Sequence, residues 1–350
     1  MTEGRQDATI MVAYLEQKER TDEALLAATA KADRLLNEIE EMVAMNCTAV
    51  DIAYSPNDLY RLKREGKKAI MLGIENGYAI GKDLSRVAHF RKRGVVYMTL
   101  CHNGNNDICG SARYNEENLG VTPFGEQVIQ EMNRLGMMVD LSHSGERTFY
   151  ETLDISSQPV VCSHSSSRAL CDHPRNLTDD QLRAIARKGG VVQVCLYSGF
   201  LRKERPAHIL DAIEHLNHMV NVMGIEHVGI GSDFDGDGGI IGCNDSSEMI
   251  NLTRQLLHER YNEEDIRRIW EVTSCVSCSK YKRMVPTNKV LKPDCRCKAC
   301  TKNKFTFAPQ SKQMNYDFNK ESAGSNCFND RRGLHLLREQ SKEQPANRRI

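Results

Sequence analysis

The sequence predicts an α/β fold, a (β/α)8 barrel of the TIM type, from three observations. Short apolar runs of strand length alternate along the chain with segments of helical periodicity. Such alternation is typical of βα units and of a parallel sheet that is buried on both faces. Polar residues of catalytic type follow the apolar runs directly, and barrel enzymes carry their chemistry at the carboxyl ends of their strands.

Seven apolar runs are predicted as barrel strands, at residues 8–15, 68–74, 95–100, 137–141, 159–163, 190–196 and 227–231. Helices are predicted from near Thr21 and Asp22, where apolar residues follow at helical spacing, and over 124–135, 178–188 and 208–223. A complete barrel has eight strands in about 250 residues, so the predicted barrel is one strand short. A doubly wound sheet is the competing architecture, but no Gly-x-Gly-x-x-Gly follows any of these strands.

The composition is that of a globular protein, but the charge divides unevenly along the chain. Of the 350 residues, 40% are hydrophobic and 27% are charged, which excludes a disordered chain, a collagen-like repeat and a membrane bundle. Residues 1–270 hold 30 basic and 40 acidic residues, a net charge of −10, whereas residues 271–350 hold 17 and 7, a net charge of +10. We therefore expect a barrel domain over 1–272 and a basic tail over 273–350.

The N-terminus and the cysteines favour a reducing compartment. Met1 is not followed by a basic region with an apolar core, and no apolar run approaches the roughly 18 residues that a membrane span needs. The number of cysteines is thirteen, which is odd and favours free thiols. The expected location is cytoplasmic, with no membrane span and no nucleic-acid partner.

Five residues of ligand type each follow a different predicted strand: Glu75, His102, His143, His164 and Asp233. Imidazoles and carboxylates at one rim suit Zn²⁺ or a similar ion. A bridging carboxylate such as Glu75 can hold two ions about 4 Å apart, and a hydroxide bound there is a nucleophile at neutral pH. A second carboxylate, Asp233, can then move the proton.

Two further charged residues lie near these positions. Arg175 is in the loop after the strand that precedes His164, where a guanidinium can clamp a substrate carboxylate in a bidentate pair or simply lie on the surface. Asp140, three residues before His143, is a possible partner of a metal-binding histidine, but a structural role is favoured.

Six short motifs occur in one order along the chain: Gly-Ile-Glu-Asn-Gly, Tyr-Met-Thr-Leu-Cys-His-Asn, Val-Asp-Leu-Ser-His-Ser, Ser-His-Ser-Ser-Ser-Arg-Ala, His-Pro-Arg-Asn and Gly-Ser-Asp-Phe-Asp-Gly. Together they resemble the membrane (renal-type) dipeptidases, which are zinc metallopeptidases on a (β/α)8 barrel. The resemblance extends from about residue 5 to residue 270. It implies dipeptides as substrates, two zinc ions and a homodimer.

The resemblance also implies a role for each matching residue. Glu75 matches the carboxylate that bridges the two zinc ions, and His143 and His164 match the pair that binds the second zinc. His102 and Arg175 match residues that bind the substrate, His102 by stabilising the tetrahedral intermediate and Arg175 by holding the carboxylate. Asp233 matches the carboxylate that contacts the substrate and handles the proton.

Two departures from the family set limits to this expectation. The family's first strand ends in a His-x-Asp pair that supplies the remaining ligands of the first zinc, and no His-x-Asp occurs in this sequence. The resemblance therefore implies that residues 8–15 are the second barrel strand and that the predicted barrel is incomplete at the N-terminus. After Trp270 the family pattern stops. The leading hypothesis is a zinc dipeptidase that uses a metal-activated hydroxide. The alternative is a catalytically impaired or truncated relative, because the His-x-Asp ligands are absent.

The tail contains a cysteine pattern of its own. Cys275-x2-Cys278 and Cys297-x2-Cys300 have the spacing of a zinc ribbon. A small zinc module is one interpretation of residues 273–350, and a disordered or foreign extension is the other. An EF-hand loop at Asp233 and a serine hydrolase are set aside, because the loop lacks its final Glu and no Gly-x-Ser-x-Gly occurs.

Overall fold

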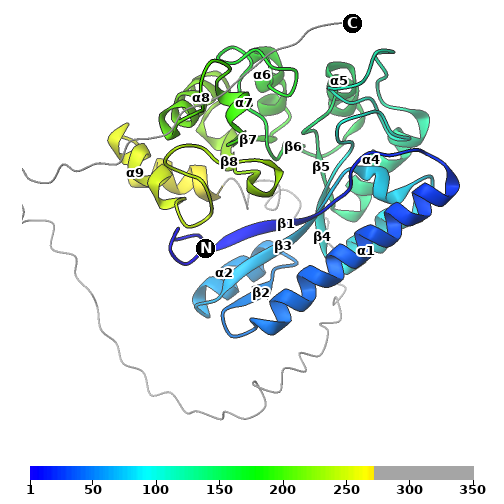
Figure 1. Cartoon of the computed structure of the whole chain (residues 1–350), viewed down its shortest axis with the longest axis horizontal. Coiled ribbons are helices and arrows are strands. Elements are labelled where there is room, and N and C mark those ends of the chain that lie inside the picture. Colours follow the sequence, from blue (N-terminus) through cyan, green and yellow to red (C-terminus); the bar gives the residue numbers. More distant parts are fainter. Residues whose placement is uncertain (272–350) are drawn as a thin grey trace, which may run out of the picture. The chain divides into compact units, whose positions relative to one another are not determined.

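The computed structural model describes residues 1–271, which form a parallel sheet with helices packed on its outer face (Figure 1). The strands are β1 (Ala8–Tyr14), β2 (Val50–Ile52), β3 (Lys68–Glu75), β4 (Val95–Thr99), β5 (Met138–Asp140), β6 (Val161–Cys162), β7 (Val191–Cys195) and β8 (Val228–Gly231). They pair in the order β1-β3-β4-β5-β6-β7-β8, with β2 beside β3, and every pairing is parallel. This sequential parallel order is the one expected for a curled barrel sheet.

The helices lie between the strands as βα units require. They are α1 (Asp22–Met45), α2 (Pro56–Arg64), α3 (Ser85–Arg93), α4 (Pro123–Leu135), α5 (Glu146–Ile155), α6 (Asp179–Arg187), α7 (Ser198–Leu201), α8 (Ile209–Met223) and α9 (Ile250–His258), with 3₁₀ turns η1 (Gly77–Ile80), η2 (Ile225–His227) and η3 (Phe234–Gly236). Residues 263–271 are helical as well. In Figure 1, α1 packs along β1 and β3, while α6 and α8 pack beside β7.

The sheet separates two apolar clusters, because successive side chains of a strand point to opposite faces. Ile70, Leu72 and Ile74 of β3 join the large cluster between the sheet and the helices. Ala69 and Met71 of the same strand join a smaller cluster with Tyr97 of β4. Two positions beyond Met71, Gly73 leaves room for the Tyr97 ring, because a Cβ there would lie 2.9 Å from it. Continuing the alternation places Glu75 on the inner face.

The predicted α/β barrel class is confirmed, including the seven strands expected from apolar runs, which are β1 and β3 to β8. β2 was not predicted from the sequence; it has three residues, contains Asp51 and pairs only with Lys68–Ile70 of β3. Such a short strand is stabilised by its neighbour rather than by an apolar run of its own. Among the described residues, β1 and β8 do not pair with each other, so the sheet has two open edges.

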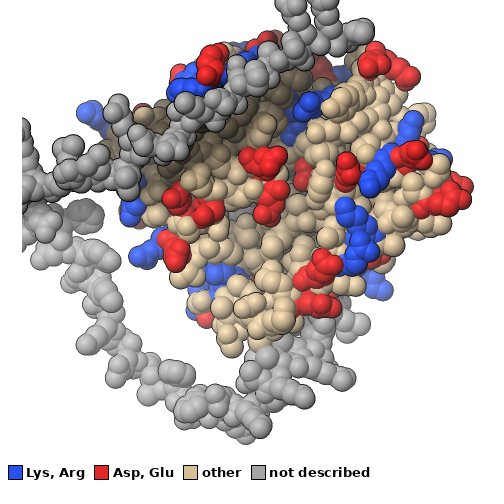
Figure 2. Space-filling view, in the orientation of Figure 1, with Lys and Arg blue, Asp and Glu red and all other residues tan. Residues whose placement is uncertain are grey.

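In the face shown in Figure 2, acidic and basic side chains lie interspersed among uncharged ones. Within residues 1–271, no helix has the length and apolar character to cross a membrane. The predicted tail, with its zinc-ribbon cysteines, lies outside the described residues. All seven cysteines of the described part are buried, and six of them are free thiols, namely Cys101, Cys109, Cys162, Cys171, Cys195 and Cys243.

Candidate metal centre

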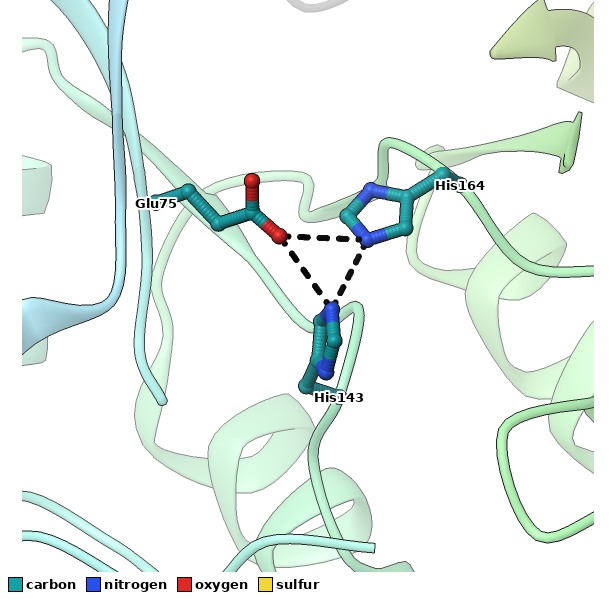
Figure 3. A group of neighbouring side chains, drawn as sticks. All are labelled: Glu75, His143 and His164. Atoms are coloured by element: carbon teal, nitrogen blue, oxygen red, sulfur yellow. Dashed lines mark hydrogen bonds and ion pairs between the residues drawn. The ribbon is translucent and has the colours of Figure 1, made fainter. Parts of the chain in front are cut away.

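Three of the predicted ligands meet at the carboxyl ends of the strands (Figure 3). His143 Nε2 lies 2.9 Å from His164 Nε2. Glu75 Oε1 lies 3.2 Å from His143 Nε2 and 3.5 Å from His164 Nε2. Two ligand atoms bound to a tetrahedral zinc at 2.0–2.1 Å are about 3.3 Å apart. The three atoms therefore have the spacing of ligands around one ion.

The hydrogen bonds on the far side of each ring leave its Nε2 atom as an electron-pair donor. His143 Nδ1 lies 3.2 Å from Asn103 Oδ1, an acceptor, so Nδ1 carries the proton. His164 Nδ1 lies 2.8 Å from Ser163 Oγ. Ser163 Oγ in turn donates its proton to Asp140, 2.6 Å away. Since both rings carry their proton on Nδ1, neither Nε2 can donate to the other. A cation between them satisfies this donor set, and the three residues fit a divalent metal ion.

Strand register and one strained backbone position bring the ligands together. Glu75 is the last residue of β3 and pairs with Thr99, which pairs with Asp140 of β5. His143 follows β5 at φ 71°, in the left-handed region that a residue with a side chain rarely adopts. Its carbonyl accepts a hydrogen bond from the Ala112 N–H at 2.7 Å. Strained conformations of this kind persist where the surroundings impose them, and they cluster at functional sites.

Burial disfavours charge on all three ligands. It raises the pKa of Glu75 to about 8, and the nearby Asp233 carboxylate adds to the effect. Burial lowers the pKa of His143 and His164 well below the usual value, helped by the Arg175 guanidinium. The imidazoles are thus neutral, as metal ligands must be. A bound cation would in turn favour the ionised form of Glu75.

His102 borders this group without joining it. Its Nε2 lies 3.9 Å from Glu75 Oε1, and its ring packs at 4.1 Å from the His143 ring, centroid to centroid. The Tyr14 ring packs edge-on against it at 4.9 Å. Burial lowers the pKa of His102 to about 4, and Arg175 contributes to the shift. A neutral imidazole at the edge of the ligand group can hydrogen bond to a bound molecule.

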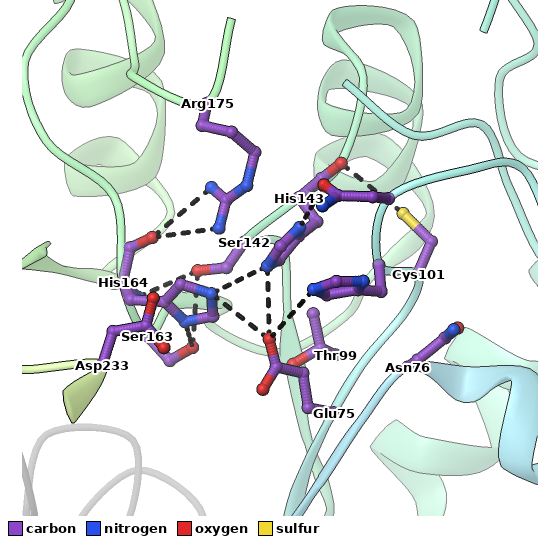
Figure 4. Close-up of polar contacts among 12 residues, drawn as sticks. Glu75, Asn76, Thr99, Cys101, Ser142, His143, Ser163, His164, Arg175 and Asp233 are labelled. Carbon is purple, nitrogen blue, oxygen red and sulfur yellow. Dashed lines mark hydrogen bonds and ion pairs between the residues drawn. The ribbon is translucent and has the colours of Figure 1, made fainter. Parts of the chain in front are cut away.

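Arg175 is a buried cation with little to hold it in place, as Figure 4 shows. The residue is 3% exposed. Its two terminal nitrogens both lie 3.5 Å from the His164 carbonyl, and its Nε has no hydrogen-bond partner among the described residues. The guanidinium carbon is 5.1 Å from the centre of the Phe200 ring. Such a group retains donors for a bidentate anion.

Asp233 follows β8 and also has a left-handed backbone, with φ 56°. Burial raises its pKa to about 6, although Arg175 acts in the opposite direction. The Cys195 thiol donates to its Oδ2 over 3.7 Å, and burial raises the pKa of that thiol well above its usual value. The Asp233 carboxylate is not one of the three converging ligands. It lies beside His164 in Figure 4.

The structure thus brings together all six candidate residues named from the sequence, but it also assigns partners that the sequence did not reveal. Asn103 holds His143, Ser163 holds His164, and Cys195 contacts Asp233. Cys195 is an inward position at the end of β7, so strand alternation was a signal that would have found it. Asn103 and Ser163 adjoin residues that were already identified, but only the loop geometry shows which way they point.

A curled parallel sheet that presents two histidines and a carboxylate to one ion at its strand ends is the architecture of metal-dependent hydrolases built on barrels. Comparison with known sequences identifies the family within this class to which the chain belongs. The model of the membrane dipeptidases, peptidase family M19, matches residues 1–273. The chain belongs to the membrane dipeptidase family.

Individual relatives agree with this assignment. An uncharacterised dipeptidase of Schizosaccharomyces pombe is 39% identical over 240 residues, covering 64% of this chain and 58% of that protein. Dipeptidase 3 of Mus musculus is 33% identical over 244 residues, covering 68% of this chain and 50% of its own length. The crystal structure of the probable dipeptidase PvdM from Pseudomonas aeruginosa superposes with a TM-score of 0.77 at 26% identity, covering 81% of this chain and 88% of that one. The chain matches less than two thirds of the length of the curated relatives compared here.

Proposed function

We propose that this protein is a zinc-dependent dipeptidase whose metal ligands are Glu75, His143 and His164. The observation that carries the proposal is the convergence of these three side chains, with the Nδ1 atoms of His143 and His164 bonded to Asn103 and Ser163 on the far side of the rings. Membership of the membrane dipeptidase family supports the substrate class. The related proteins from Schizosaccharomyces pombe and Mus musculus carry the name dipeptidase.

Zinc is the ion that two imidazoles and a carboxylate suit best. When bound, it lowers the pKa of a water molecule to near 7 and polarises the amide carbonyl of the substrate. The protein's own residues must then orient the dipeptide and move one proton. His102, Arg175 and Asp233 surround the ligand group and are the candidates for these tasks.

Arg175 is proposed to hold the C-terminal carboxylate of the dipeptide. Its buried guanidinium has an unpartnered Nε and only two long hydrogen bonds, so a planar carboxylate can replace weak contacts with a bidentate pair. Holding the C-terminal carboxylate close to the ligand group favours substrates whose scissile bond lies next to their last residue. The neutral His102 ring, at the other side of the ligand group, is proposed to donate to the carbonyl oxygen as negative charge develops there.

Asp233 is proposed to carry the proton from the attacking water to the leaving amine. It projects from the loop after β8 toward the ligand group, beside His164 (Figure 4). The fixed left-handed backbone and the Cys195 thiol limit where its carboxylate can lie. A positioned carboxylate of this kind contributes about 10²- to 10⁴-fold to a rate as a general acid and base.

The test is hydrolysis of dipeptides by the purified full chain with and without zinc. To keep the tail cysteines from binding the metal, all six cysteines of residues 272–350 are replaced by Ser; this is the tail-Ser background. We expect zinc to restore activity after chelation, and His143→Ala to abolish it. His258→Ala, a change of an exposed histidine, serves as the control. Full activity of His143→Ala would refute the assignment.

A second candidate function is a relative that binds one ion and has little peptidase activity. The observation in its favour is that the described residues contain a single group of three potential metal ligands. The number of zinc ions bound in the tail-Ser background separates the two proposals. Two ions per chain would exclude the second candidate, whereas one ion together with a rate below 1% of that of a related dipeptidase would favour it.

Two coarser features of the protein are also proposals. The family resemblance favours a homodimer, which sedimentation of the purified chain would test. Six free, buried thiols in residues 1–271, at Cys101, Cys109, Cys162, Cys171, Cys195 and Cys243, favour a reducing compartment such as the cytoplasm. Fractionation of cells with an antibody against the chain would test that location.

A further inference from the structure

Asp140 is a buried carboxylate whose hydrogen bonds all come from residues around the metal ligands. It has no exposed surface. Its Oδ2 accepts hydrogen bonds from Thr99 Oγ1 and Ser163 Oγ, each at 2.6 Å. Its Oδ1 accepts hydrogen bonds from the backbone N–H groups of Ser142 at 3.0 Å and Ser163 at 2.9 Å. Four donors compensate the loss of hydration, so a carboxylate can be buried here at an acceptable cost.

The hydroxyl of Ser163 links this carboxylate to a metal ligand. Ser163 Oγ lies 2.6 Å from Asp140 Oδ2. It also lies 2.8 Å from His164 Nδ1 (Figure 4). A hydroxyl has one proton to donate, and Ser163 donates it to the Asp140 carboxylate, which is both the closer acceptor and the charged one. The bond to the ring must therefore run from His164 Nδ1–H to the hydroxyl oxygen. With the hydrogen bonds in these directions, His164 carries its proton on Nδ1 and its lone pair on Nε2, which is the atom that faces Glu75 and His143.

The two histidines are held by unequal partners. His143 Nδ1 bonds to the neutral amide oxygen of Asn103 at 3.2 Å. His164 Nδ1 bonds at 2.8 Å to a hydroxyl that is itself polarised by a buried carboxylate. The backbone N–H of His164 is also fixed, by Ser142 Oγ at 2.9 Å. Ring orientation and proton position are thus more firmly determined at His164.

We infer that Ser163, oriented by Asp140, is a positioning residue that fixes the ring and the tautomer of His164 for metal binding. The inference rests on the proposed metal site and explains how His164 is kept in the ring orientation and tautomer that bind a metal. Partners of this kind change metal affinity by about 10- to 100-fold when they are removed. Neither residue belongs to the group of three converging ligands, so each acts through His164.

The experiment compares zinc affinity in the tail-Ser background by competition with a coloured chelator. Ser163→Ala removes the hydroxyl that joins His164 to Asp140, and we expect zinc to bind 10- to 100-fold more weakly. The matched control is Thr99→Val, which removes another 2.6 Å hydrogen bond to the same carboxylate without touching the ring. We expect its zinc affinity to stay within threefold of the parent, even where its thermal stability falls. Ser163→Thr retains a hydroxyl and should rescue affinity to within threefold.

The outcomes separate this inference from the proposed function. If the parent binds zinc and Ser163→Ala binds it equally well, the inference fails and the metal site stands. If Ser163→Ala and Thr99→Val lose the same affinity, Asp140 has only a structural role, and the inference also fails. Should Ser163→Ala not fold, as judged by circular dichroism, Ser163→Gly removes the same hydroxyl, and we expect it to bind zinc 10- to 100-fold more weakly as well. A parent that binds no zinc at a site dependent on His143 would overturn the proposed function itself.

Discussion

The guanidinium of Arg175 accounts for much of the electrostatics of the site. It is buried, it lowers the pKa of all three site histidines after the effect of burial itself, and it opposes the raised pKa of Glu75 and Asp233. A buried cation of this kind is costly unless it pairs with an anion. The proposed substrate carboxylate is such an anion, and it would compensate the cost only while it is bound.

Replacing Arg175 by Lys should therefore weaken binding of dipeptides more than it slows their turnover. A lysine keeps the charge but loses the planar, bidentate donors. Losing one hydrogen bond to a charged group costs about 1.5–3 kcal/mol, or roughly 10- to 100-fold in KM. Steady-state kinetics with a dipeptide and with its C-terminal amide measures the effect, since the parent should prefer the acid and Arg175→Lys should lose most of that preference.

The control for this experiment is Arg168→Lys in the same loop. The Arg168 side chain donates to the carbonyls of Pro174 and Asn176, so it supports the loop without reaching the metal ligands. Its kinetic constants should stay within threefold of the parent. An unchanged preference for the acid in Arg175→Lys would show that another residue holds the carboxylate.

At the residue scale, the sequence predicted the three side chains that converge but not the residues that support them. Glu75, His143 and His164 could be named because each lies at the carboxyl end of an apolar strand or within three residues of it, and parallel strands bring these ends to one rim. The bonds from Asn103 and Ser163 depend on side-chain rotamers and on the turn after each strand. The spacing of residues along a sequence does not indicate rotamers or turn geometry. For that reason the sequence favoured a structural role for Asp140 over a role as the partner of a metal-binding histidine.

Among the elements, α8 begins with an ion cluster that has no counterpart in the site. Asp211 lies in its first turn, is 3% exposed and accepts hydrogen bonds from Arg202 at 2.7 Å and Arg205 at 2.8 Å. It also accepts the backbone N–H of His208, the capping residue of the helix, at 2.8 Å. Burial would raise the pKa of Asp211, but the two arginines outweigh it and hold the pKa far below 3.8.

Replacing Asp211 by Asn should destabilise the protein by about 2 kcal/mol at pH 7, because the helix loses a charged cap and two ion pairs. The sign of the pH dependence follows from the lowered pKa. The stabilisation is complete above the unfolded pKa of about 3.9 and is lost as the pH falls toward the folded value. Urea unfolding at several pH values should therefore show a difference between parent and Asp211→Asn that is constant above pH 5 and shrinks below pH 4.

Asp180→Asn is the matched control, because Asp180 is in the first turn of α6 and its side chain is 86% exposed. We expect it to change the free energy of unfolding by no more than about 0.5 kcal/mol. A difference between Asp211→Asn and the parent that grew as the pH fell would contradict the predicted direction.

The strands were more predictable than the strand ends. Seven of them are apolar runs, and each was located within two residues. Six of these, β3 to β8, are buried on both faces, whereas β1 at the edge of the sheet is mostly half-buried. β6 shrinks to Val161–Cys162, against a predicted 159–163, because only these two residues pair in register with β7. β2 had no local signal, since its partner β3 rather than its own composition holds it.

For the molecule as a whole, the order of the strands in the sheet determines which backbone amides are protected by a neighbouring strand. Within residues 1–271, β4 pairs with a strand on each side, whereas β1 pairs with β3 alone. In a parallel sheet, alternate N–H groups of a strand point to opposite neighbours. Every second amide of β1 therefore lacks a strand partner among the described residues.

Hydrogen exchange tests this asymmetry. Alternate amides of Ala8–Tyr14 should exchange at least 100-fold faster than their neighbours in the same strand, and the amides of Val95–Thr99 should be uniformly slow. Measurement by NMR resolves single amides. Uniform slow exchange along β1 would mean that another strand covers this edge and that the described sheet is not the whole sheet.

The zero net charge of the chain belongs to no single part of it. The acidic residues 1–270 coincide with the described sheet and helices, and every candidate site residue lies there. We propose that residues 1–272 form the catalytic domain and that the basic residues 273–350 are a separate part. In this proposal the six cysteines of the tail take no part in the chemistry.

The central claim is that Glu75, His143 and His164 bind one divalent ion together. The most direct measurement is the zinc content of the tail-Ser protein and of its His143→Ala variant after equilibrium dialysis at equal free zinc. The account predicts that the variant holds at least one zinc ion per chain fewer than the parent, while His258→Ala holds as many. Equal zinc content in the parent and in His143→Ala would contradict it.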